Sequence, residues 1–457
     1  MKEKIHFIGI GGIGMSGLAA FSLAKNKAVS GSDLEKNDLT ARLGRDGATV
    51  YEGHSEDNIA DDVKLVVRSA CIKDDNPEIV KARRLDIPVI SRGEYLKRVM
   101  EEFPVSIAVT GTHGKTTTSG LIAHILECCG KDPAALIGGE IEILKGNAKY
   151  GRGDIIVAEV DESDGTFSEI KSTHALITSI EREHMDHYDS MENVVKAYRE
   201  FVSRISPQGT FFFNGEDPTV RHLSREVERK KGSFGINGDF QVTCKGLECT
   251  KSIEFDSVIS GVDFGRIKSS LVGRHNVMNI LGAIAVSMSM GLGFEKVSEA
   301  IGSFSGVKRR FEVIDRVGTI EVIEDYAHHP TELDAVISAA RDYSEGRVIT
   351  VFQPHRYSRT RDLAGSFVNC FYDSNVLILT DVYSAFEDKT EETDIRDIFN
   401  GIDKDRFEIL DFMEMDRIPE YVSGIVREND LVLVLGAGDI RKISGAIAEK
   451  IREKKGD

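Results

Sequence analysis

A glycine-rich motif between a buried strand and a helix constrains this chain more than any other feature. Residues 111–117 read GTHGKTT; they follow the apolar run Val105–Val109, which predicts a strand, and they open a helical pattern. Glycines in such a turn let successive backbone N–H groups point into one concavity, and the helix N-terminus adds positive potential. Lys115 can reach terminal phosphates, and the Thr116 hydroxyl can hold Mg²⁺. The motif predicts a triphosphate site, in a tighter variant of the usual loop, because Val109 occupies the position of its first glycine. The alternative is an ordinary turn from strand to helix.

A second glycine cluster follows the first predicted strand, Ile5–Ile10. Its glycines are Gly9, Gly11, Gly12, Gly14 and Gly17. Asp33 lies 19 residues beyond Gly14, where an acid is placed to bind a ribose. The spacing allows a tight turn and a close approach of the backbone to a diphosphate. The pattern therefore predicts a site for a nucleotide diphosphate, without distinguishing NAD from another one.

Acidic residues gather after the buried strand predicted for Ile155–Ala158. Glu159 follows that strand directly, and Asp161 and Glu162 come next. A carboxylate at the end of a strand beside a phosphate loop is well placed to bind Mg²⁺. We favour Glu159 for this role. For Asp161 and Glu162, a solvated acidic loop is an equally good interpretation.

Three histidine groups also follow predicted parallel strands, at the edge where an open α/β sheet binds ligands. They are His184 with His187, His328 with His329, and His355 within the run HRYSR. In that run, Arg356 and Arg359 could clamp a carboxylate or a phosphate, or they could form a solvated helix start. Asn276 and Asn279 have the same spacing and could face one ligand.

Short apolar strands alternate with amphipathic helices along nearly the whole chain, a pattern typical of α/β domains with parallel sheets. Pro104 follows a charged helix end, and residues 306–310, GVKRR, form a second plausible linker. We therefore expect three domains, each with a largely parallel Rossmann-like sheet, over residues 1–103, 104–306 and 307–457. In the central domain, of the P-loop ATPase type, the segments TFFFN, QVTCKG and SIEFD indicate a small antiparallel subsheet.

The charge balance excludes several classes of protein. The 457 residues include 58 Lys and Arg against 75 Asp and Glu, a net charge of −17, whereas proteins that coat nucleic acid or anionic membranes need a basic footprint. No secretory signal is recognisable, and the six cysteines have irregular spacings, which favours a reduced, cytoplasmic location. The uncharged stretch 276–294 contains polar residues and glycines, so we expect a buried helix there rather than a membrane span.

Segments spread in order along the chain resemble the Mur ligase family, most closely the members that add alanine. They are FIGIGGIGMSGLA, GSD, DNPE, VTGTHGKTTT, AEVDESD, EHMDHY, GRHNVMN, RRFE, DYAHHPTE and FQPHRYSRTRDL. The last two are the most specific, because they separate these members from ligases that add later residues and from folylpolyglutamate synthetases. The resemblance implies an ATP- and Mg²⁺-dependent ligase that joins L-alanine to the carboxylate of UDP-N-acetylmuramate through an acyl phosphate, in peptidoglycan precursor synthesis.

The resemblance also implies roles for individual residues. The UDP-sugar is expected at Gly11, Gly12, Gly14 and Ser16, so that the ribose-binding acid Asp33 would serve it rather than NAD. ATP is expected at Gly111, Thr112, His113, Gly114, Lys115, Thr116 and Thr117, with Asn276 and Asn279 on the adenine side and Arg310 reaching the phosphates. Thr116 and Glu159 would hold one Mg²⁺, and His184 would help to hold a second. The amino acid and the reacting centre are expected at Tyr326, His328, His355, Arg356 and Arg359. The residues expected to act in catalysis are Lys115, Glu159, His184, Arg310, His328 and His355.

Three other interpretations stay open. An NAD-dependent dehydrogenase would leave the phosphate loop unused, and a nucleotide-gated binding module would leave the histidine and arginine groups unexplained. A sister ligase that attaches a peptide is the third. The chain departs from the family pattern at Glu183, where Asp is commoner, and at Ala327, where Gly is commoner. We expect a monomer or weak homodimer with no nucleic-acid partner.

Overall fold

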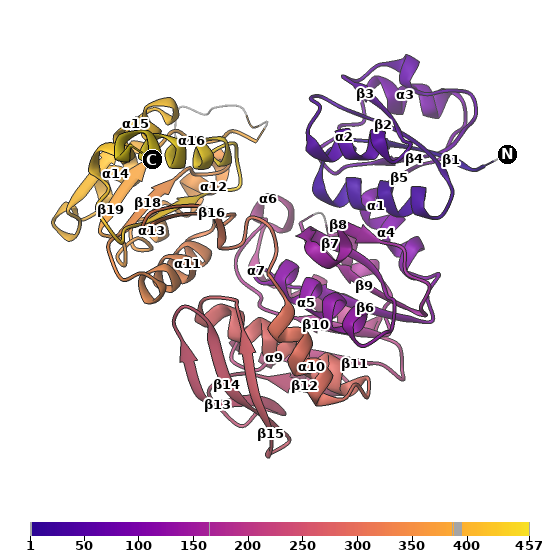
Figure 1. Ribbon diagram of the computed structural model, residues 1–457. Helices are drawn as coiled ribbons and strands as arrows, with labels where there is room; N and C mark the ends of the chain where they lie inside the picture. The colour runs from indigo at the N-terminus through magenta and orange to yellow at the C-terminus, as the bar shows by residue number, and fades with distance from the viewer. Residues whose placement is uncertain (1, 164, 386, 388–394, 457) are drawn as a thin grey trace. The chain divides into compact units, whose positions relative to one another are not determined.

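A computed structural model describes residues 2–163, 165–385, 387 and 395–456 of the chain (Figure 1). It divides into two compact units. The first consists of Met1–Lys245, Phe255–Ile267 and Met278–Ser305, and the second of Gly246–Glu254, Lys268–Val277 and Gly306–Asp457. The described chain holds three separate sheets, which confirms the predicted class of three α/β domains with mostly parallel sheets. The expected domain limits, 103/104 and 306/307, fall between these sheets.

The first sheet has five parallel strands in the order β3-β2-β1-β4-β5. Its strands are β1 (Lys4–Ile8), β2 (Ala28–Asp33), β3 (Thr49–Glu52), β4 (Val63–Arg68) and β5 (Val89–Ser91), and its helices are α1 (Ile13–Ala24), α2 (Asp38–Arg45), α3 (Pro77–Arg84) and α4 (Arg92–Met100). Helix α3 begins at Pro77, because the Asn76 side chain accepts a hydrogen bond from the Glu78 N–H and proline suits the first helical position.

The second sheet has ten strands in the order β15-β14-β13-β12-β11-β10-β6-β9-β7-β8. They are β6 (Val105–Thr110), β7 (Ala134–Ile141), β8 (Gly146–Lys149), β9 (Ile155–Glu159), β10 (His174–Ile177), β11 (Thr210–Asn214), β12 (Lys230–Phe234), β13 (Val242–Cys249), β14 (Ile253–Ile259) and β15 (Val262–Ser269). The helices are α5 (Lys115–Cys128), α6 (Met185–Tyr188), α7 (Met191–Ser203), α8 (Pro218–Glu226), α9 (Arg274–Ser289) and α10 (Phe294–Ser303). Strand β8 pairs with β7 in the antiparallel sense, so the sheet is mixed.

The prediction that TFFFN belongs to an antiparallel subsheet is wrong. This segment is β11, and it pairs in parallel with both β10 and β12. The reason is that helix α8 lies between β11 and β12 and carries the chain back to the starting edge of the sheet. The other two segments, QVTCKG and SIEFD, lie on the neighbouring strands β13 and β14, joined by residues 250–252. That connection is too short for a parallel crossover, so these strands are antiparallel.

The third sheet has six strands in the order β16-β17-β21-β18-β19-β20, of which only the pair β16–β17 is antiparallel. The strands are β16 (Glu312–Val317), β17 (Ile320–Asp325), β18 (Val348–Phe352), β19 (Val376–Leu379), β20 (Ile409–Phe412) and β21 (Leu431–Leu435). The helices are α11 (Pro330–Tyr343), α12 (Tyr357–Asp362), α13 (Ala364–Phe367), α14 (Ile395–Gly401), α15 (Ile418–Ile425) and α16 (Arg441–Lys455).

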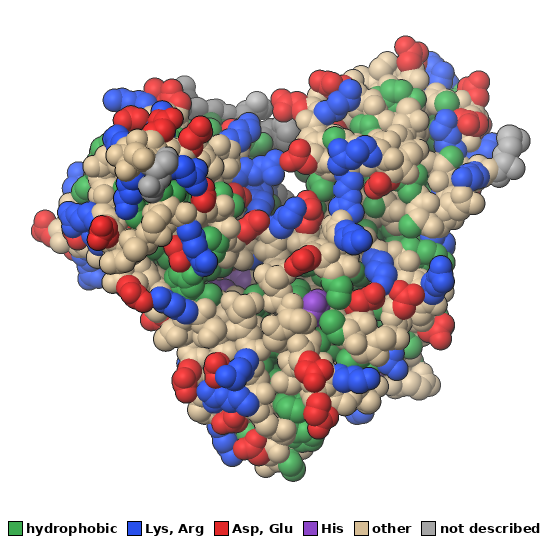
Figure 2. Space-filling model, viewed as in Figure 1, with side chains coloured by type: hydrophobic (Ala, Val, Ile, Leu, Met, Phe, Trp, Pro, Cys, Tyr) green, Lys and Arg blue, Asp and Glu red, His purple; other side chains and the backbone are tan. Residues whose placement is uncertain are grey.

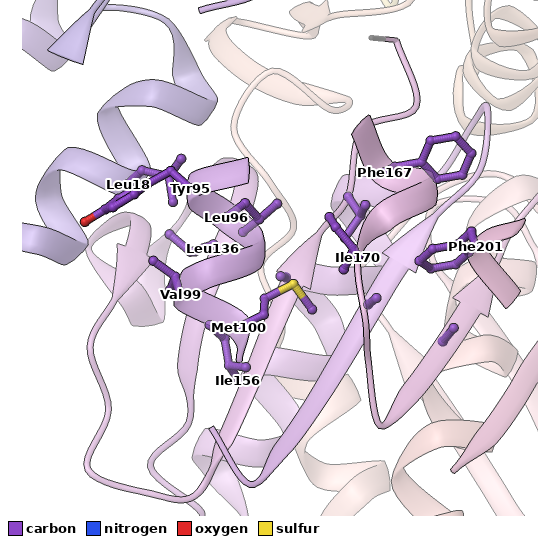
Figure 3. Packing of buried hydrophobic residues seen from close by; sticks show 14 of the residues in the cluster. Leu18, Tyr95, Leu96, Val99, Met100, Leu136, Ile156, Phe167, Ile170 and Phe201 are labelled. Atoms are coloured by element: carbon purple, nitrogen blue, oxygen red, sulfur yellow. The ribbon is translucent and has the colours of Figure 1, made fainter. Parts of the chain in front are cut away.

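One hydrophobic core joins the helices of the first sheet to the second sheet within the first unit (Figure 3). Helix α4 contributes the buried side chains of Tyr95, Leu96, Val99 and Met100. Leu136 of β7 and Ile156 of β9 belong to the same cluster, as does Leu18 of α1. Burial of this apolar surface fixes α4, and with it the residues at its first turn, against the central sheet.

Gly93, in the first turn of α4, tests how tightly this interface is packed. A Cβ at this position would overlap the Thr166 side chain, so we expect Gly93→Ala to lower the stability of the fold by about 1–3 kcal/mol. The matched control is Gly44→Ala in α2, where a new Cβ would meet no atom within 4 Å. That variant should be neutral, or more stable by up to about 1 kcal/mol. Scanning calorimetry of both variants decides the point: a Gly93→Ala protein as stable as the wild type would contradict the packing.

Acidic and basic side chains are interspersed over the face shown in Figure 2, so the excess of acidic residues does not form one uniform field there. In the described part of the chain, none of the helices combines the length and the apolarity that crossing a bilayer requires. The uncharged stretch expected to be a buried helix forms most of α9, whose residues Val277, Ile280, Leu281 and Ile284 are fully buried.

Candidate active site

The phosphate loop has the conformation that its glycines permit. Gly111 has φ +130° and Gly114 has φ +78°, both in the region that side-chain-bearing residues avoid. A Cβ at Gly111 would also overlap Thr178, and one at Gly114 would overlap Asn279. Helix α5 starts directly after the loop, and no side chain caps it. The N–H groups of its first turn therefore face the concavity of the loop, where an anion can bind them.

The segment after β10 holds the loop in place. Ser179 accepts a hydrogen bond from the Thr112 N–H through its carbonyl (2.9 Å) and from the His113 N–H through its hydroxyl (3.1 Å). The Glu181 N–H in turn donates to the Thr112 hydroxyl (2.8 Å). Strand β10 ends at Ile177, because the residues that follow bind the loop.

Lys115 lies inside the loop that it was predicted to serve. Its Nζ donates to the carbonyls of Gly111 (2.6 Å) and Thr112 (3.2 Å), and to Oε1 of Glu162 (3.0 Å). Burial by itself would lower the pKa of this amine, but the charges of Glu162, Asp161 and Glu159 raise the pKa above its ordinary value. Lys115 is therefore a fixed positive charge at the place where terminal phosphates are expected.

The buried carboxylate of Glu162, the half-buried carboxylate of Asp161 and the histidine His184 form one group beside this lysine. The ligand atoms of Asp161, Glu162 and His184 all lie within 4.8 Å of one another. Burial raises the pKa of Glu162 to about 7, with Lys115 opposing the shift and Asp161 adding to it. Burial also acts to raise the pKa of Asp161, but Arg92, Lys115 and His184 outweigh it and keep that pKa well below its usual range. Asp161 is therefore ionised at neutral pH.

This group fits a bound Mg²⁺. Among the described residues, Oε2 of Glu162 is one of the buried side-chain atoms with no hydrogen-bond partner, and a cation would satisfy it. The carboxylate that we favoured, Glu159, instead accepts a hydrogen bond from the Gly138 N–H (2.8 Å), although its charge still acts on Lys115. Our alternative of a solvated acidic loop is wrong for Glu162, whose side chain is only 4% exposed.

The glycine turn of the first sheet is held by the acid predicted to bind a ribose. Oδ2 of Asp33 accepts a hydrogen bond from the Gly11 N–H (2.7 Å), and the Asn37 side chain donates to the Gly11 carbonyl (3.1 Å). The Ser16 hydroxyl donates to the Ile13 carbonyl within the first turn of α1 (3.0 Å). These contacts shape the turn; the direct binding of substrate by Asp33 and Ser16 stays a prediction.

The two asparagines have separate contacts. Oδ1 of Asn279 accepts a hydrogen bond from the Thr118 hydroxyl (3.1 Å) and stands against Gly114, so Asn279 belongs to the phosphate loop of the first unit. Asn276 lies in the second unit, where its side chain donates to the Val272 carbonyl (2.7 Å). Their common binding of one ligand stays a prediction.

The second unit gathers the remaining predicted residues at the carboxyl ends of its strands. The ring centroids of His328 and His355 are 5.8 Å apart, and those of Tyr326 and His328 are 5.3 Å apart. The guanidinium of Arg310 lies 5.3 Å from the centroid of the Tyr326 ring, a distance at which cation and ring attract. Nη1 of Arg359 is 3.4 Å from Nδ1 of His355.

The two histidines of this cluster differ in their surroundings. Burial, His328, Arg359 and Arg356 together lower the pKa of His355 to about 3, so His355 is neutral at physiological pH. Nδ1 of His328 is 3.0 Å from the Tyr326 carbonyl and 3.5 Å from the Glu332 carboxylate. Both neighbours are acceptors, so Nδ1 carries a proton and the lone pair of the neutral ring is on Nε2.

Arg356 already binds a carboxylate in this structure. Its Nε donates to Oε1 of Glu387 (2.6 Å), and the same carboxylate accepts hydrogen bonds from the Ser358 N–H (3.0 Å) and hydroxyl (2.7 Å). The sequence left two interpretations open for this arginine, an anion clamp and a solvated helix start. Its partner here is a carboxylate of the chain itself, so its binding of a substrate anion stays a prediction.

Comparisons with known proteins agree along nearly the whole chain. Residues 4–104 match the model of the Mur ligase family, catalytic domain, residues 109–287 the Mur ligase middle domain, and residues 309–438 the Mur ligase, glutamate ligase domain. This chain belongs to the Mur ligase family.

Individual relatives extend this result. The Mur ligase described here is 41% identical to the UDP-N-acetylmuramate–L-alanine ligase of Anaeromyxobacter sp. (strain Fw109-5), over 96% of this chain and 95% of the relative. It is 40% identical to the ligase of the same name from Geobacter sulfurreducens, over 99% and 98%. The crystal structure of the UDP-N-acetylmuramate-alanine ligase from Thermotoga maritima superposes with a TM-score of 0.85, at 31% identity and with 99% of each chain covered.

Two features of this Mur ligase's site were missed by reasoning from the sequence. The burial of Glu162 beside Lys115 was left undecided, because an acidic run looks the same whether it is buried or solvated. Arg92, whose Nη2 lies 3.0 Å from Oδ2 of Asp161, was not considered at all. A signal for Arg92 existed, since a basic residue at the first position of a helix opposes the helix dipole and requires a partner.

Proposed function

We propose that this Mur ligase joins L-alanine to the carboxylate of UDP-N-acetylmuramate with conversion of ATP to ADP and phosphate, in peptidoglycan precursor synthesis. The observation that carries the proposal is the similarity, over 96% or more of the chain, to enzymes named for this reaction. The phosphate loop and the cluster of histidine and arginine side chains supply the two kinds of chemistry that such a reaction needs.

The first step activates a carboxylate, which by itself is a poor acylating agent. A carboxylate oxygen of the muramate attacks the γ-phosphorus of ATP, the bond to the β-phosphate oxygen breaks, and an acyl phosphate and ADP result. Two anions must approach each other in this step. In our proposal the fixed charge of Lys115, with Arg310 from the second unit, opposes their repulsion. Thr116 and Glu159 would hold one Mg²⁺, and His184, with its neighbours Asp161 and Glu162, would help to hold a second; when bound, these ions would supply further charge neutralisation.

The second step forms the amide. The neutral amine of alanine attacks the acyl carbon, and a tetrahedral intermediate forms. The bond between this carbon and the oxygen that carries the phosphoryl group then breaks, and phosphate leaves. The amine must lose a proton, and we assign its acceptance to Nε2 of His328, the nitrogen that carries the lone pair. In our proposal Arg356 and Arg359 bind the carboxylate of the amino acid.

Phosphate release with ATP, Mg²⁺ and UDP-N-acetylmuramate tests this function. We expect release to depend on the added amine and to be fastest with L-alanine, slower with glycine or L-serine, and slowest with a tripeptide. The reaction should yield one phosphate per amide, measured by mass spectrometry of the UDP-linked product. Release that is equally fast without any amine would contradict the ligase, a preference for the tripeptide would favour the peptide-adding alternative, and turnover of NADH would favour the dehydrogenase.

Three further parts of the proposal go with this function. We propose a cytoplasmic location, since ATP and a UDP-sugar are the co-substrates. We propose a monomer or weak homodimer, which light scattering can test. We also keep the domain limits 1–103, 104–306 and 307–457 as a proposal, which limited proteolysis at the two junctions can test.

A further inference from the structure

Arg92 occupies the first position of α4, and its place is determined by the core beneath that helix. Tyr95, Leu96 and Val99 of α4 are buried in the cluster shared with the second sheet. Helix α4 is also capped by Ser91, whose hydroxyl accepts a hydrogen bond from the Glu94 N–H (3.0 Å). The backbone from which the Arg92 side chain extends is therefore held between the two sheets of the first unit.

A positive charge at this position needs an anion nearby. The N-terminus of a helix carries partial positive charge, so an arginine there is repelled unless an acid compensates it. The Arg92 side chain is only 18% exposed, and its Nη2 lies 3.0 Å from Oδ2 of Asp161. The two residues are far apart in the sequence and come from elements of different sheets, so this ion pair links the sheets.

The other side of the guanidinium faces the glycine turn of the first sheet. A Cβ at Gly14 would lie 3.0 Å from Nη1 of Arg92. Gly14 belongs to the first turn of α1, which no side chain caps, so the N–H groups of that turn form an anion site of their own. A diphosphate bound at this turn would bring a second anion within reach of the same guanidinium, and Arg binds phosphate with two parallel hydrogen bonds.

Asp161 is joined to the phosphate loop through its neighbour. Glu162 binds Nζ of Lys115, and the charge of Asp161 acts on the same amine. In this structure the positive charge of Arg92 compensates the charge of Asp161, which reduces the negative charge that Asp161 and Glu162 present to a dication. Gly14, Arg92, Asp161, Glu162 and Lys115 thus form a series of neighbours that leads from the glycine turn to the phosphate loop.

We propose that Arg92 is a positioning residue that couples the two nucleotide sites: a diphosphate at the glycine turn draws its guanidinium away from Asp161, which frees Asp161 to bind the dication of Mg²⁺–nucleotide. The coupling is positive and reciprocal, because each ligand favours the same arrangement of Arg92. The inference rests on the proposed function in one respect, that a UDP-sugar binds at the glycine turn.

Calorimetric titration tests the coupling without turnover. The dissociation constant of Mg²⁺–ADP is measured with and without saturating UDP-N-acetylmuramate, in the wild type and in Arg92→Met. In the wild type we expect the UDP-sugar to tighten Mg²⁺–ADP binding roughly fivefold or more. In Arg92→Met the ratio of the dissociation constants without and with UDP-sugar should fall to about one. Mg²⁺–ADP alone should bind this variant more tightly than it binds the wild type, because Asp161 is no longer neutralised. A merely structural role would weaken both ligands.

Arg98→Met is the matched control, because Arg98 lies on the same helix but pairs with Glu94 at the surface. It should keep the wild-type ratio, and Arg92→Lys should restore part of it. A ratio unchanged in Arg92→Met, or weaker binding of Mg²⁺–ADP alone to that variant, would overturn the proposal. If the wild type bound no UDP-sugar at all, the proposed function itself would be contradicted. If phosphate release depended on alanine but Arg92→Met kept the wild-type ratio of dissociation constants, the function would stand and only the coupling would be refuted.

Discussion

Replacing Lys115 by methionine is expected to lower the turnover number about a hundredfold or more, the scale of losing one preorganised charge contact in an active site. Methionine keeps most of the volume of the side chain but removes the charge that three loop and carboxylate contacts hold in place. The first chemical step brings two anions together, so the loss should fall on that step. The measurement is alanine-dependent phosphate release at saturating substrates.

The same variant should also become less stable as the pH rises. Without Lys115, the buried carboxyl of Glu162 loses the charge that lowers its pKa, so the pKa rises further above its value of about 7. A carboxyl with a pKa raised in the folded state binds more protons folded than unfolded, and stability therefore falls with increasing pH through that range. The fall extends from the ordinary pKa of a glutamate, 4.5, to the raised pKa in the folded state, so melting temperatures between roughly pH 5 and pH 9 should show the effect.

The double variant Lys115→Met with Glu162→Gln separates charge from folding. It should recover the stability at high pH, because the buried carboxyl of residue 162 is no longer present to ionise, and it should stay as inactive as the single variant. A control at the surface is Lys97→Met, because the partner of Lys97, Glu169, is largely exposed. This variant should leave both the turnover number and the stability at high pH unchanged. Near-normal turnover of Lys115→Met would remove the phosphate loop from the reaction.

Replacing His328 by glutamine is expected to lower the turnover number by about 10²–10⁴, the usual contribution of a positioned proton acceptor. Glutamine preserves the size of the side chain and a hydrogen bond to the Tyr326 carbonyl, but it cannot accept the amine's proton. The loss should be confined to the second step. Trapping of the acyl phosphate by hydroxylamine, which is neutral at pH 7 and needs no base, should therefore persist in this variant.

His355→Gln is the matched comparison, because the two rings lie side by side in the same cluster. A pKa of about 3 makes His355 a weak base, so we expect its replacement to cost less than that of His328. It should mainly raise the Michaelis constant for alanine through the loss of contact with Arg359. A larger loss of turnover in His355→Gln would reverse the assignment, and near-normal turnover in both variants would place the base elsewhere.

Local patterns predicted the elements that carry the site. The loop at Gly111–Lys115 could be recognised because left-handed backbone favours glycine and because an apolar strand and a helix flank it. The error at TFFFN arose because strand composition does not reveal direction, which depends on the helix α8 that follows.

The side chains around the loop were harder to predict. Arg356 and Arg359 were proposed as an anion clamp, and the structure shows Arg356 binding a carboxylate. Glu332, which holds His328, gave no sequence signal beyond its spacing on α11. Glu159 was preferred over its neighbours because strand ends are visible in a sequence, whereas the depth at which the next loop is buried is not.

By itself, the sequence determined the α/β class, the two glycine turns and the identity of the charged residues after the strands, because each of these depends on neighbours a few positions away. The tertiary structure alone decided which charges meet. The Lys115–Glu162 contact joins residues 47 positions apart, and the Arg92–Asp161 contact joins residues 69 positions apart. Such pairs form only when the burial of apolar helix faces such as that of α4 brings distant segments together, and the same burial removes the water that would otherwise screen them.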